Sequence, residues 1–231
     1  MMRTRATPHD ALIATEDDLA RAIVILRDAD PAVAAMLARA GMPPLRKREG
    51  GLHGLAWIVV SQQVSTHAAR AIFARLEARY PAFDAAELAG ASDEDLRACG
   101  LSAPKMRAMR ALGVAVSEGA LDLAGLADLS AEDARAVLTQ VKGVGPWTAD
   151  VYLLFCLGHP DVWPVGDLAL QEGARLALGL RKRPDAARME KIGKRWRPWR
   201  AAAARLLWAY YGVARGEAKF TIEPPRVDPT P

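Results

Sequence analysis

Apolar residues recur along this chain at intervals of three and four positions, the spacing expected of amphipathic helices. Behind a capping box at Thr15–Asp18, residues 19, 22, 23 and 26 are all apolar and predict one buried helix face. Similar patterns predict further helices at residues 31–40, 53–60, 66–79, 93–98, 103–117, 121–126, 130–138, 147–156, 168–178 and 201–211. No strand-like alternation persists anywhere, so the pattern predicts an all-α fold.

One turn-rich stretch, Met42–Gly51 (MPPLRKREGG), interrupts this pattern and is the best candidate for a crossing between two lobes. We expect a flexible N-terminus at residues 1–14, a helical domain at 15–215 and a flexible, proline-rich tail at 216–231. Within the helical domain, one lobe is predicted over about residues 52–160. The other lobe combines the N-terminal helices with about residues 161–215.

Composition and charge leave the class of partner open. Half of the 231 residues are hydrophobic, which suffices for a core, and the net charge of +4 permits a polyanionic partner. The charge is uneven, because residues 181–200 carry nine Lys/Arg against two acidic residues. A solvated helix face is the usual explanation for such a run.

The two cysteines, Cys99 and Cys156, lie far apart in apolar surroundings and read as reduced core residues of a cytoplasmic protein. Neither has metal-ligand spacing to any of the four histidines. The sequence has no secretory h-region and no apolar run long enough to span a membrane, so we expect no membrane partner.

The middle of the chain holds a glycine-rich turn, Val141-Lys-Gly-Val-Gly-Pro-Trp147, between two segments with helical patterning. Both glycines can adopt positive φ, and the amides around Gly143, Gly145 and Trp147 can then converge on one point. Converging amides at a helix N-terminus form an anion site, for which a phosphate diester is the obvious occupant. An ordinary helix–turn–helix corner is the competing interpretation.

Two further stretches carry polar groups on an apolar background. Ser61-Gln62-Gln63-Val64-Ser65 places two amides side by side, either in a capping and turn network or where they can enter a duplex or bind a base. The extended stretch 161–167 leads to Asp167, which is positioned as the N-cap of the following helix. Taken alone, Asp167 is a plain helix cap.

The stretch 61–65, the glycine-rich turn 141–147 and Asp167 are most informative when their order and spacing are considered together. With Trp-Arg-Pro-Trp-Arg at 196–200, the chain resembles 3-methyladenine DNA glycosylase II, of the helix–hairpin–helix glycosylase superfamily, over about residues 15–213. The resemblance implies a two-lobed helical fold without the N-terminal β lobe of the longer bacterial enzymes. It also implies duplex DNA with alkylated bases as the partner, bound by a monomer.

By this resemblance, Asp167 falls on the family's catalytic aspartate. A fixed carboxylate there can stabilise the oxocarbenium ion that forms on the sugar and orient a water. Trp147 stands where bifunctional members carry a Schiff-base lysine, and Lys142 lies before that position, which implies a monofunctional enzyme with water as nucleophile. No cysteine follows Cys156, so the iron–sulfur cluster of other branches cannot form and no cofactor is expected.

The resemblance also assigns binding residues. It places Trp147 and Trp208 in an aromatic base pocket, with Val151 at another pocket position and Tyr152 beside it. Gln63 falls on the residue that wedges into the duplex. Backbone carbonyls in the hairpin could hold a structural monovalent cation, at Thr139, Val141 and Val144. The full set of expected DNA-binding residues is Gln62, Gln63, Ser65, Lys142, Gly143, Val144, Gly145, Trp147 and Thr148.

The leading hypothesis is therefore a base-excision repair glycosylase that flips an alkylated purine, of the 3-methyladenine or 7-methylguanine type, out of duplex DNA. Flipping costs a few kcal/mol, least for damaged pairs. The alternatives are a non-catalytic helix–hairpin–helix DNA-binding protein, and a glycosylase for oxidised or deaminated bases.

Overall fold

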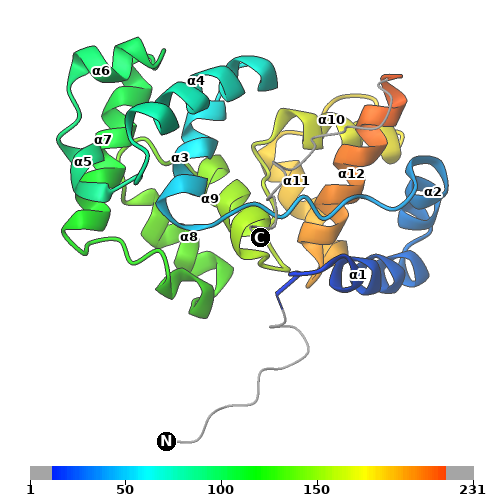
Figure 1. The fold of residues 1–231 in the computed structure, drawn as a ribbon. Coiled ribbons are helices and arrows are strands. Elements are labelled where there is room, and N and C mark those ends of the chain that lie inside the picture. Colours follow the sequence, from blue (N-terminus) through cyan, green and yellow to red (C-terminus); the bar gives the residue numbers. More distant parts are fainter. Residues whose placement is uncertain (1–11, 217–231) are drawn as a thin grey trace, which may run out of the picture. The chain divides into compact units, whose positions relative to one another are not determined.

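The computed structural model describes residues 12–216, and this part of the chain is built of helices (Figure 1). The residues so described form no strand, and the all-α prediction is confirmed. They divide into two compact units. We call Glu49–Cys156 the hairpin unit, and the chain up to Arg48 together with the chain from Leu157 the aspartate unit.

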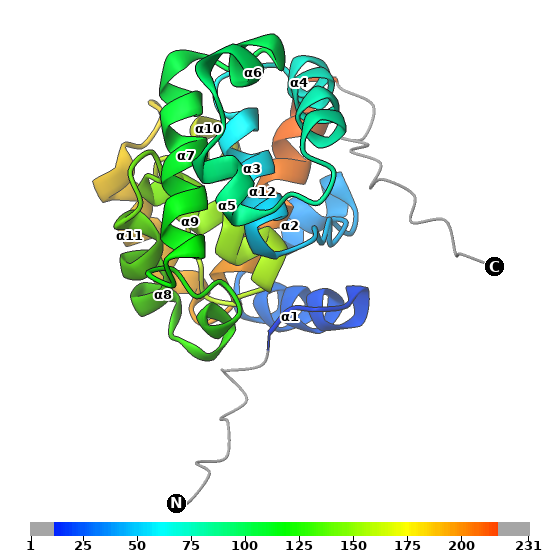
Figure 2. The same ribbon diagram turned by 60° about the vertical axis from the view of Figure 1, so that its left-hand side comes forward.

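The hairpin unit is organised around α3, whose apolar side chains are buried on most sides. This helix packs against α4, α7 and α9 (Figure 2). Buried side chains of α3 to α7 form one apolar cluster that includes Val60, Phe73, Leu76, Leu88 and Met109. The helices of this unit are α3 (Gly51–Ser61), α4 (Thr66–Arg79), α5 (Ala85–Ala89), α6 (Asp93–Ala98), α7 (Ala103–Ser117), α8 (Ala131–Thr139) and α9 (Pro146–Tyr152).

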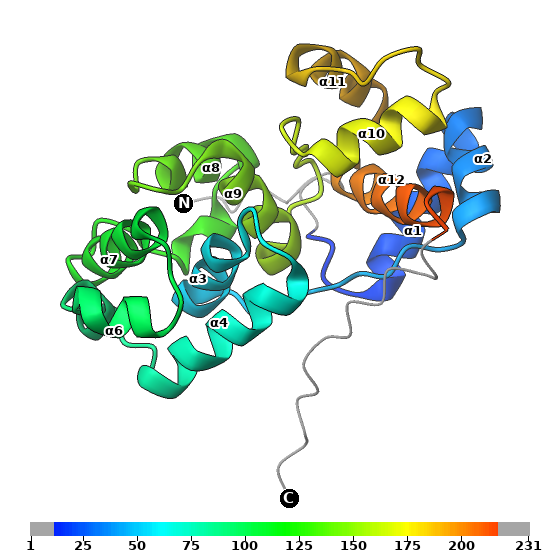
Figure 3. The same ribbon diagram turned by 90° about the horizontal axis from the view of Figure 1, so that it is seen from above.

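The aspartate unit has α12 at its centre, with α1, α2 and α10 packed against it (Figure 3). Four consecutive alanines, 201–204, are completely buried at the start of α12, where small side chains let neighbouring helices come close. A Cβ built on Gly173 of α10 would lie 2.8 Å from the Leu207 carbonyl oxygen of α12. The helices here are α1 (Glu16–Ala29), α2 (Pro31–Ala40), α10 (Leu168–Ala177), α11 (Ala186–Gly193) and α12 (Arg200–Ala214).

Helix starts follow the sequence signals closely. Thr15 and Asp18 form the expected capping box, and Asp30 caps α2 ahead of Pro31. Ser102 precedes α7, and a serine there predicts a capping hydrogen bond, but its side chain makes none. Chemical signals at single positions therefore predict helix starts well, because capping bonds span only a few residues.

Other differences concern weak elements and boundaries. Residues 121–126 were expected to be helical, yet only a 3₁₀ turn forms, at Gly125–Asp128, while the short helix α5 had no sequence signal. The helix after the hairpin changes to a π-helical turn at Leu153–Leu157. The contacts separate the units after residues 48 and 156, against the expected limits of about 52 and 160. Residues 1–11 and 217–231 of the predicted flexible ends lie outside the described part.

Candidate functional site

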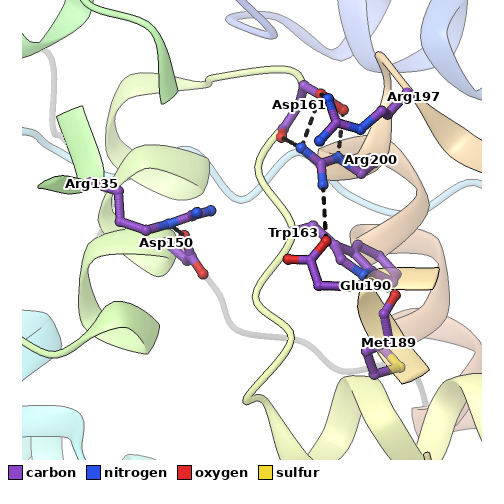
Figure 4. A network of polar contacts seen from close by, with 8 residues as sticks. All are labelled: Arg135, Asp150, Asp161, Trp163, Met189, Glu190, Arg197 and Arg200. Carbon is purple, nitrogen blue, oxygen red and sulfur yellow. Dashed lines mark hydrogen bonds and ion pairs between the residues drawn. The ribbon is translucent and has the colours of Figure 1, made fainter. Parts of the chain in front are cut away.

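The hairpin corner joins two helices whose starts are both fixed by local sequence. Ser130 caps α8, since its hydroxyl oxygen accepts a hydrogen bond from the Asp133 amide at 3.1 Å. Pro146 occupies the first turn of α9, where its missing N–H costs nothing. An ion pair between Arg135 Nε and Asp150 Oδ1, 2.5 Å apart, ties α8 to α9 (Figure 4). Because Asp150 is buried, this pair fixes the angle between the helices.

The two glycines of the turn do different things. Gly143 has φ of +94°, and a Cβ built on it would lie 2.4 Å from the Cβ of Ala108 on α7. Gly145 has φ of −87°, which any residue can adopt, and nothing lies within 4 Å of its Cβ position. The expectation that both adopt positive φ is thus wrong for Gly145. Gly143 lets the turn pack against α7, whereas Gly145 leaves open space at the N-terminal end of α9.

That open end is where the sequence predicts an anion site. Amides in the first turn of a helix point toward its N-terminus, where the helix dipole favours negative charge. Lys142 is exposed, Trp147 is half-buried and Val144 is buried. The Val141 carbonyl accepts a hydrogen bond from the Val144 amide at 3.0 Å, and the Thr139 hydroxyl donates to the Arg135 carbonyl at 2.9 Å. The cation predicted at residues 139, 141 and 144 stays a prediction.

The Ser61–Ser65 stretch, hereafter the insertion loop, separates its two glutamines. Gln62 Nε2 donates to Thr148 Oγ1 at 2.8 Å, whereas Gln63 is exposed with φ of +54°. Thr148 is only 2% exposed, so its side chain is buried in this network and is not available to contact DNA. A contact through its backbone stays a prediction. Ser65 caps α4 by accepting a hydrogen bond from the Ala68 amide at 3.2 Å. The turn-network interpretation therefore applies to Gln62, whereas the entry of Gln63 into a duplex stays a prediction.

Asp167 occupies the N-cap of α10, as the sequence predicts. Its Oδ1 accepts hydrogen bonds from the Leu170 amide at 2.7 Å and from Trp208 Nε1 at 3.0 Å. The side chains of Asp167 and Trp208 are both half-buried. The structure thus brings the predicted catalytic carboxylate and one predicted pocket aromatic into direct contact within the aspartate unit.

Several side chains hold the loop that carries Asp167. Arg200 makes a two-pronged pair with Asp161, at 2.7 and 3.0 Å, and also donates to the Asp161 carbonyl at 2.7 Å (Figure 4). Trp163 Nε1 donates to the Met189 carbonyl at 2.8 Å. Gln171 Nε2 donates to the Val165 carbonyl at 2.8 Å. The loop is therefore fixed at three points between α9 and the carboxylate.

Ion pairs made by arginines of the basic run at 181–200 change the interpretation of that run. Arg195 pairs with the buried Asp30 at 2.7 Å, and Arg197 and Arg200 both pair with Asp161. Three of the nine cations thus stabilise the fold. The remaining six are exposed, at positions 181, 182, 183, 188, 191 and 194.

Tyr152 is a correction to the predicted base pocket. Its side chain is completely buried, and its hydroxyl accepts a hydrogen bond from the Gly51 amide at 3.0 Å. Burial raises the pKa of Tyr152 to about 12. The ring is therefore part of the core, while Val151 beside it is half-buried.

Sequence reasoning missed the residues that position the others. Lys105 donates from Nζ to the Val60 carbonyl at 2.7 Å, just before the insertion loop, and Gln171 braces the loop before Asp167. The only signal for Gln171 was a polar residue on the buried face of an amphipathic helix. Lys105 gave no signal, because its partner lies 45 residues away.

Two kinds of site are absent from residues 12–216. No group of three or more His, Cys, Asp or Glu in this part of the chain is placed to hold a metal ion. No helix there is both long and apolar enough to cross a membrane.

Comparison with known proteins gives a consistent result. Residues 56–198 match the HhH-GPD superfamily of base excision DNA repair proteins. DNA-3-methyladenine glycosylase 1 of Schizosaccharomyces pombe is 35% identical over 156 residues, which cover 65% of this chain and 68% of that protein.

Solved structures agree with the sequence comparison. The S. pombe 3-methyladenine DNA glycosylase Mag1, in complex with abasic DNA, superposes with a TM-score of 0.75 at 30% identity, covering 84% of this chain and 97% of Mag1. A Bacillus halodurans DNA-3-methyladenine glycosidase superposes with a TM-score of 0.68 at 31% identity, covering 81% and 92%. The hairpin, the capping aspartate and these matches together show that the chain belongs to the HhH-GPD superfamily of base excision DNA repair proteins, in its 3-methyladenine glycosylase branch.

Proposed function

We propose that this protein is a monofunctional DNA glycosylase that binds duplex DNA, flips an alkylated purine and hydrolyses its N-glycosidic bond. The observation that carries the proposal is Asp167, a carboxylate held by the Leu170 amide and the Trp208 indole. Similarity to the S. pombe and B. halodurans enzymes supports the choice of alkylated purines.

The chemistry follows from a fixed negative charge. As the glycosidic bond breaks, positive charge develops on the sugar, and a preorganised carboxylate stabilises it without reorganising. An alkylated purine carries positive charge and leaves readily, so no strong general acid is needed. Aromatic faces attract a cationic base through cation–π interaction, which fits the pocket role that the family resemblance assigns to Trp147 and to Trp208.

Water is the proposed nucleophile. The hairpin has Trp147 where a lyase would carry the lysine that forms a Schiff base, and Lys142 lies on the other side of the turn. The expected product is an abasic site with no covalent enzyme–sugar intermediate.

The test compares two capping aspartates in the same unit. Asp167→Asn keeps the cap of α10 but removes the charge, and Asp185→Asn does the same for α11, where Asp185 accepts from the Arg188 amide at 2.8 Å. We expect Asp167→Asn to lower single-turnover release of free base from methylated duplex DNA by about 100-fold or more. Asp185→Asn should stay within about twofold of wild type.

Each outcome decides between the candidate functions. Equal release by the wild type and Asp167→Asn would refute the mechanism, and no release by either would favour a DNA-binding protein without catalysis. A complex trapped by borohydride would refute water as the nucleophile and favour a lyase acting on oxidised bases.

A further inference from the structure

Gln63 holds an uncommon backbone conformation in an exposed position. Its φ of +54° is in the left-handed region, which few non-glycine residues adopt. Such a conformation persists only where neighbouring contacts determine it. The contacts on either side of Gln63 therefore show what the fold holds in place.

On the hairpin side, the neighbouring Gln62 is bonded to Thr148 at 2.8 Å (Figure 3 shows the loop between α3 and α4 beside α9). Thr148 lies in the first turn of α9, three residues beyond Gly145. Its hydroxyl is buried and its backbone is helical, so it offers a fixed point and not a flexible one. The insertion loop is thus bonded directly to the first turn of α9, which follows the hairpin turn.

A second contact comes from α7. Lys105 Nζ donates to the Val60 carbonyl at 2.7 Å, near the C-terminal end of α3, where a helix favours positive charge. Lys105 is half-buried, and burial lowers the pKa of its ammonium group. Three residues along α7, Ala108 packs against Gly143 of the hairpin turn. One face of α7 therefore contacts both the base of the insertion loop and the glycine turn.

We propose that Thr148 and Lys105 are positioning residues that hold the insertion loop and the hairpin as one preassembled part. In this part, Gln63 stands at a fixed offset from the phosphate bound at the hairpin, ready to enter the duplex when the damaged base leaves. Because the loop is already ordered, base flipping does not carry the entropic cost of ordering it. The inference rests on the proposed function, since Gln63 acts only if a base is flipped.

The experiment measures flipping separately from chemistry. The probe is a duplex with 7-methylguanine on a 2′-fluorinated sugar, which resists hydrolysis, next to 2-aminopurine, whose fluorescence rises when its neighbour unstacks. Thr148→Val removes the hydroxyl at constant shape, and we expect it to lower the flipping equilibrium constant about fivefold, which corresponds to about 1 kcal/mol. Thr148→Ser keeps the hydroxyl and should restore at least half of the lost amplitude.

A double-mutant cycle tests the contact itself. Gln62→Met should lower the flipping equilibrium constant about as much as Thr148→Val. The double variant should flip no less than either single variant, because each of the three proteins lacks the same Gln62–Thr148 hydrogen bond. Lys105→Met should lower flipping from the other side of the loop and add to the effect of Thr148→Val. Ser117→Ala on α7 serves as the control. The hydrogen bond that the structure gives the Ser117 hydroxyl goes to the Val114 carbonyl of the same helix, at 3.2 Å, and does not involve the insertion loop.

Failure of this inference can be told apart from failure of the proposed function. If the wild type releases no base from methylated DNA, the proposed function fails and the inference with it. If the wild type releases bases and Thr148→Val flips as well as wild type, only the positioning role is refuted. A loss that Thr148→Ser does not restore also refutes it, because the hydroxyl would not be the cause.

Discussion

Gly143→Ala should lower the stability of this protein, whereas Gly145→Ala should lower its affinity for DNA. The two positions lie two residues apart in the same turn, and each substitution adds one methyl group. At Gly143 the methyl meets Ala108 of α7 at 2.4 Å and the backbone is left-handed. At Gly145 the methyl meets nothing within 4 Å and lies in open space at the start of α9, where we propose that a phosphate binds.

The expected magnitudes follow from these contacts. For Gly143→Ala, a left-handed backbone costs roughly 1–2 kcal/mol and overpacking roughly 1–3 kcal/mol, so the free energy of unfolding should fall by about 2–5 kcal/mol. Gly145→Ala should change stability by less than about 1 kcal/mol, since its φ is ordinary. Its methyl should hold a phosphate away from one or two amides, and a charge-assisted hydrogen bond contributes about 1.5–3 kcal/mol. Affinity for duplex DNA should therefore fall about 10- to 100-fold.

Two assays separate the effects. Urea unfolding followed by circular dichroism gives the change in stability, and fluorescence anisotropy with a labelled undamaged duplex at fixed salt gives the change in affinity. Fixed salt is essential, because phosphate binding weakens steeply as salt rises. If Gly145→Ala bound duplex within threefold of wild type, the hairpin would not be the phosphate site. If Gly143→Ala were as stable as wild type, its packing against α7 would not matter.

Three further substitutions test other parts of the structure. Arg200→Met should lower the free energy of unfolding by about 2–3 kcal/mol in a urea titration, because Arg200 is 9% exposed and leaves the 24%-exposed Asp161 without its principal partner. Tyr152→Phe should cost about 1–2 kcal/mol by the same measurement, through an unsatisfied backbone amide, and leave base release unchanged. Asp95→Asn should destabilise above about pH 4 and progressively less below it, because the hydrogen bond from Arg79 holds the pKa of Asp95 below its usual value.

Each of these has a control or a contrary outcome. Lys191→Met removes an exposed cation and should stay within about 0.5 kcal/mol, unlike Arg200→Met. A strong loss of base release by Tyr152→Phe without a loss of stability would return Tyr152 to the base pocket. For Asp95, the carboxylate stabilises the fold above its unfolded pKa and loses this effect as pH falls through the folded one. A gap between Asp95→Asn and wild type that widened toward pH 3 would contradict that sign.

The sequence by itself determined the local features of this protein. The capping box at Thr15, the proline at the start of α9 and the aspartate cap of α10 each depend on residues within one helical turn. Apolar spacing likewise predicted the long helices, because residues three and four positions apart lie on the same face of a helix. The hairpin, the insertion loop and Asp167 could all be singled out for the same reason.

Only the tertiary structure decided what these residues do for one another. The sequence showed two adjacent glutamines, and folding bonded Gln62 to Thr148, 86 residues away, while leaving Gln63 exposed. The sequence also showed two glycines that looked equivalent. In the folded protein Gly143 packs against α7, whereas nothing lies within 4 Å of the Cβ position of Gly145. The physical reason is that caps and helix faces depend on near neighbours, whereas burial and long-range hydrogen bonds depend on which distant segments the whole core brings together.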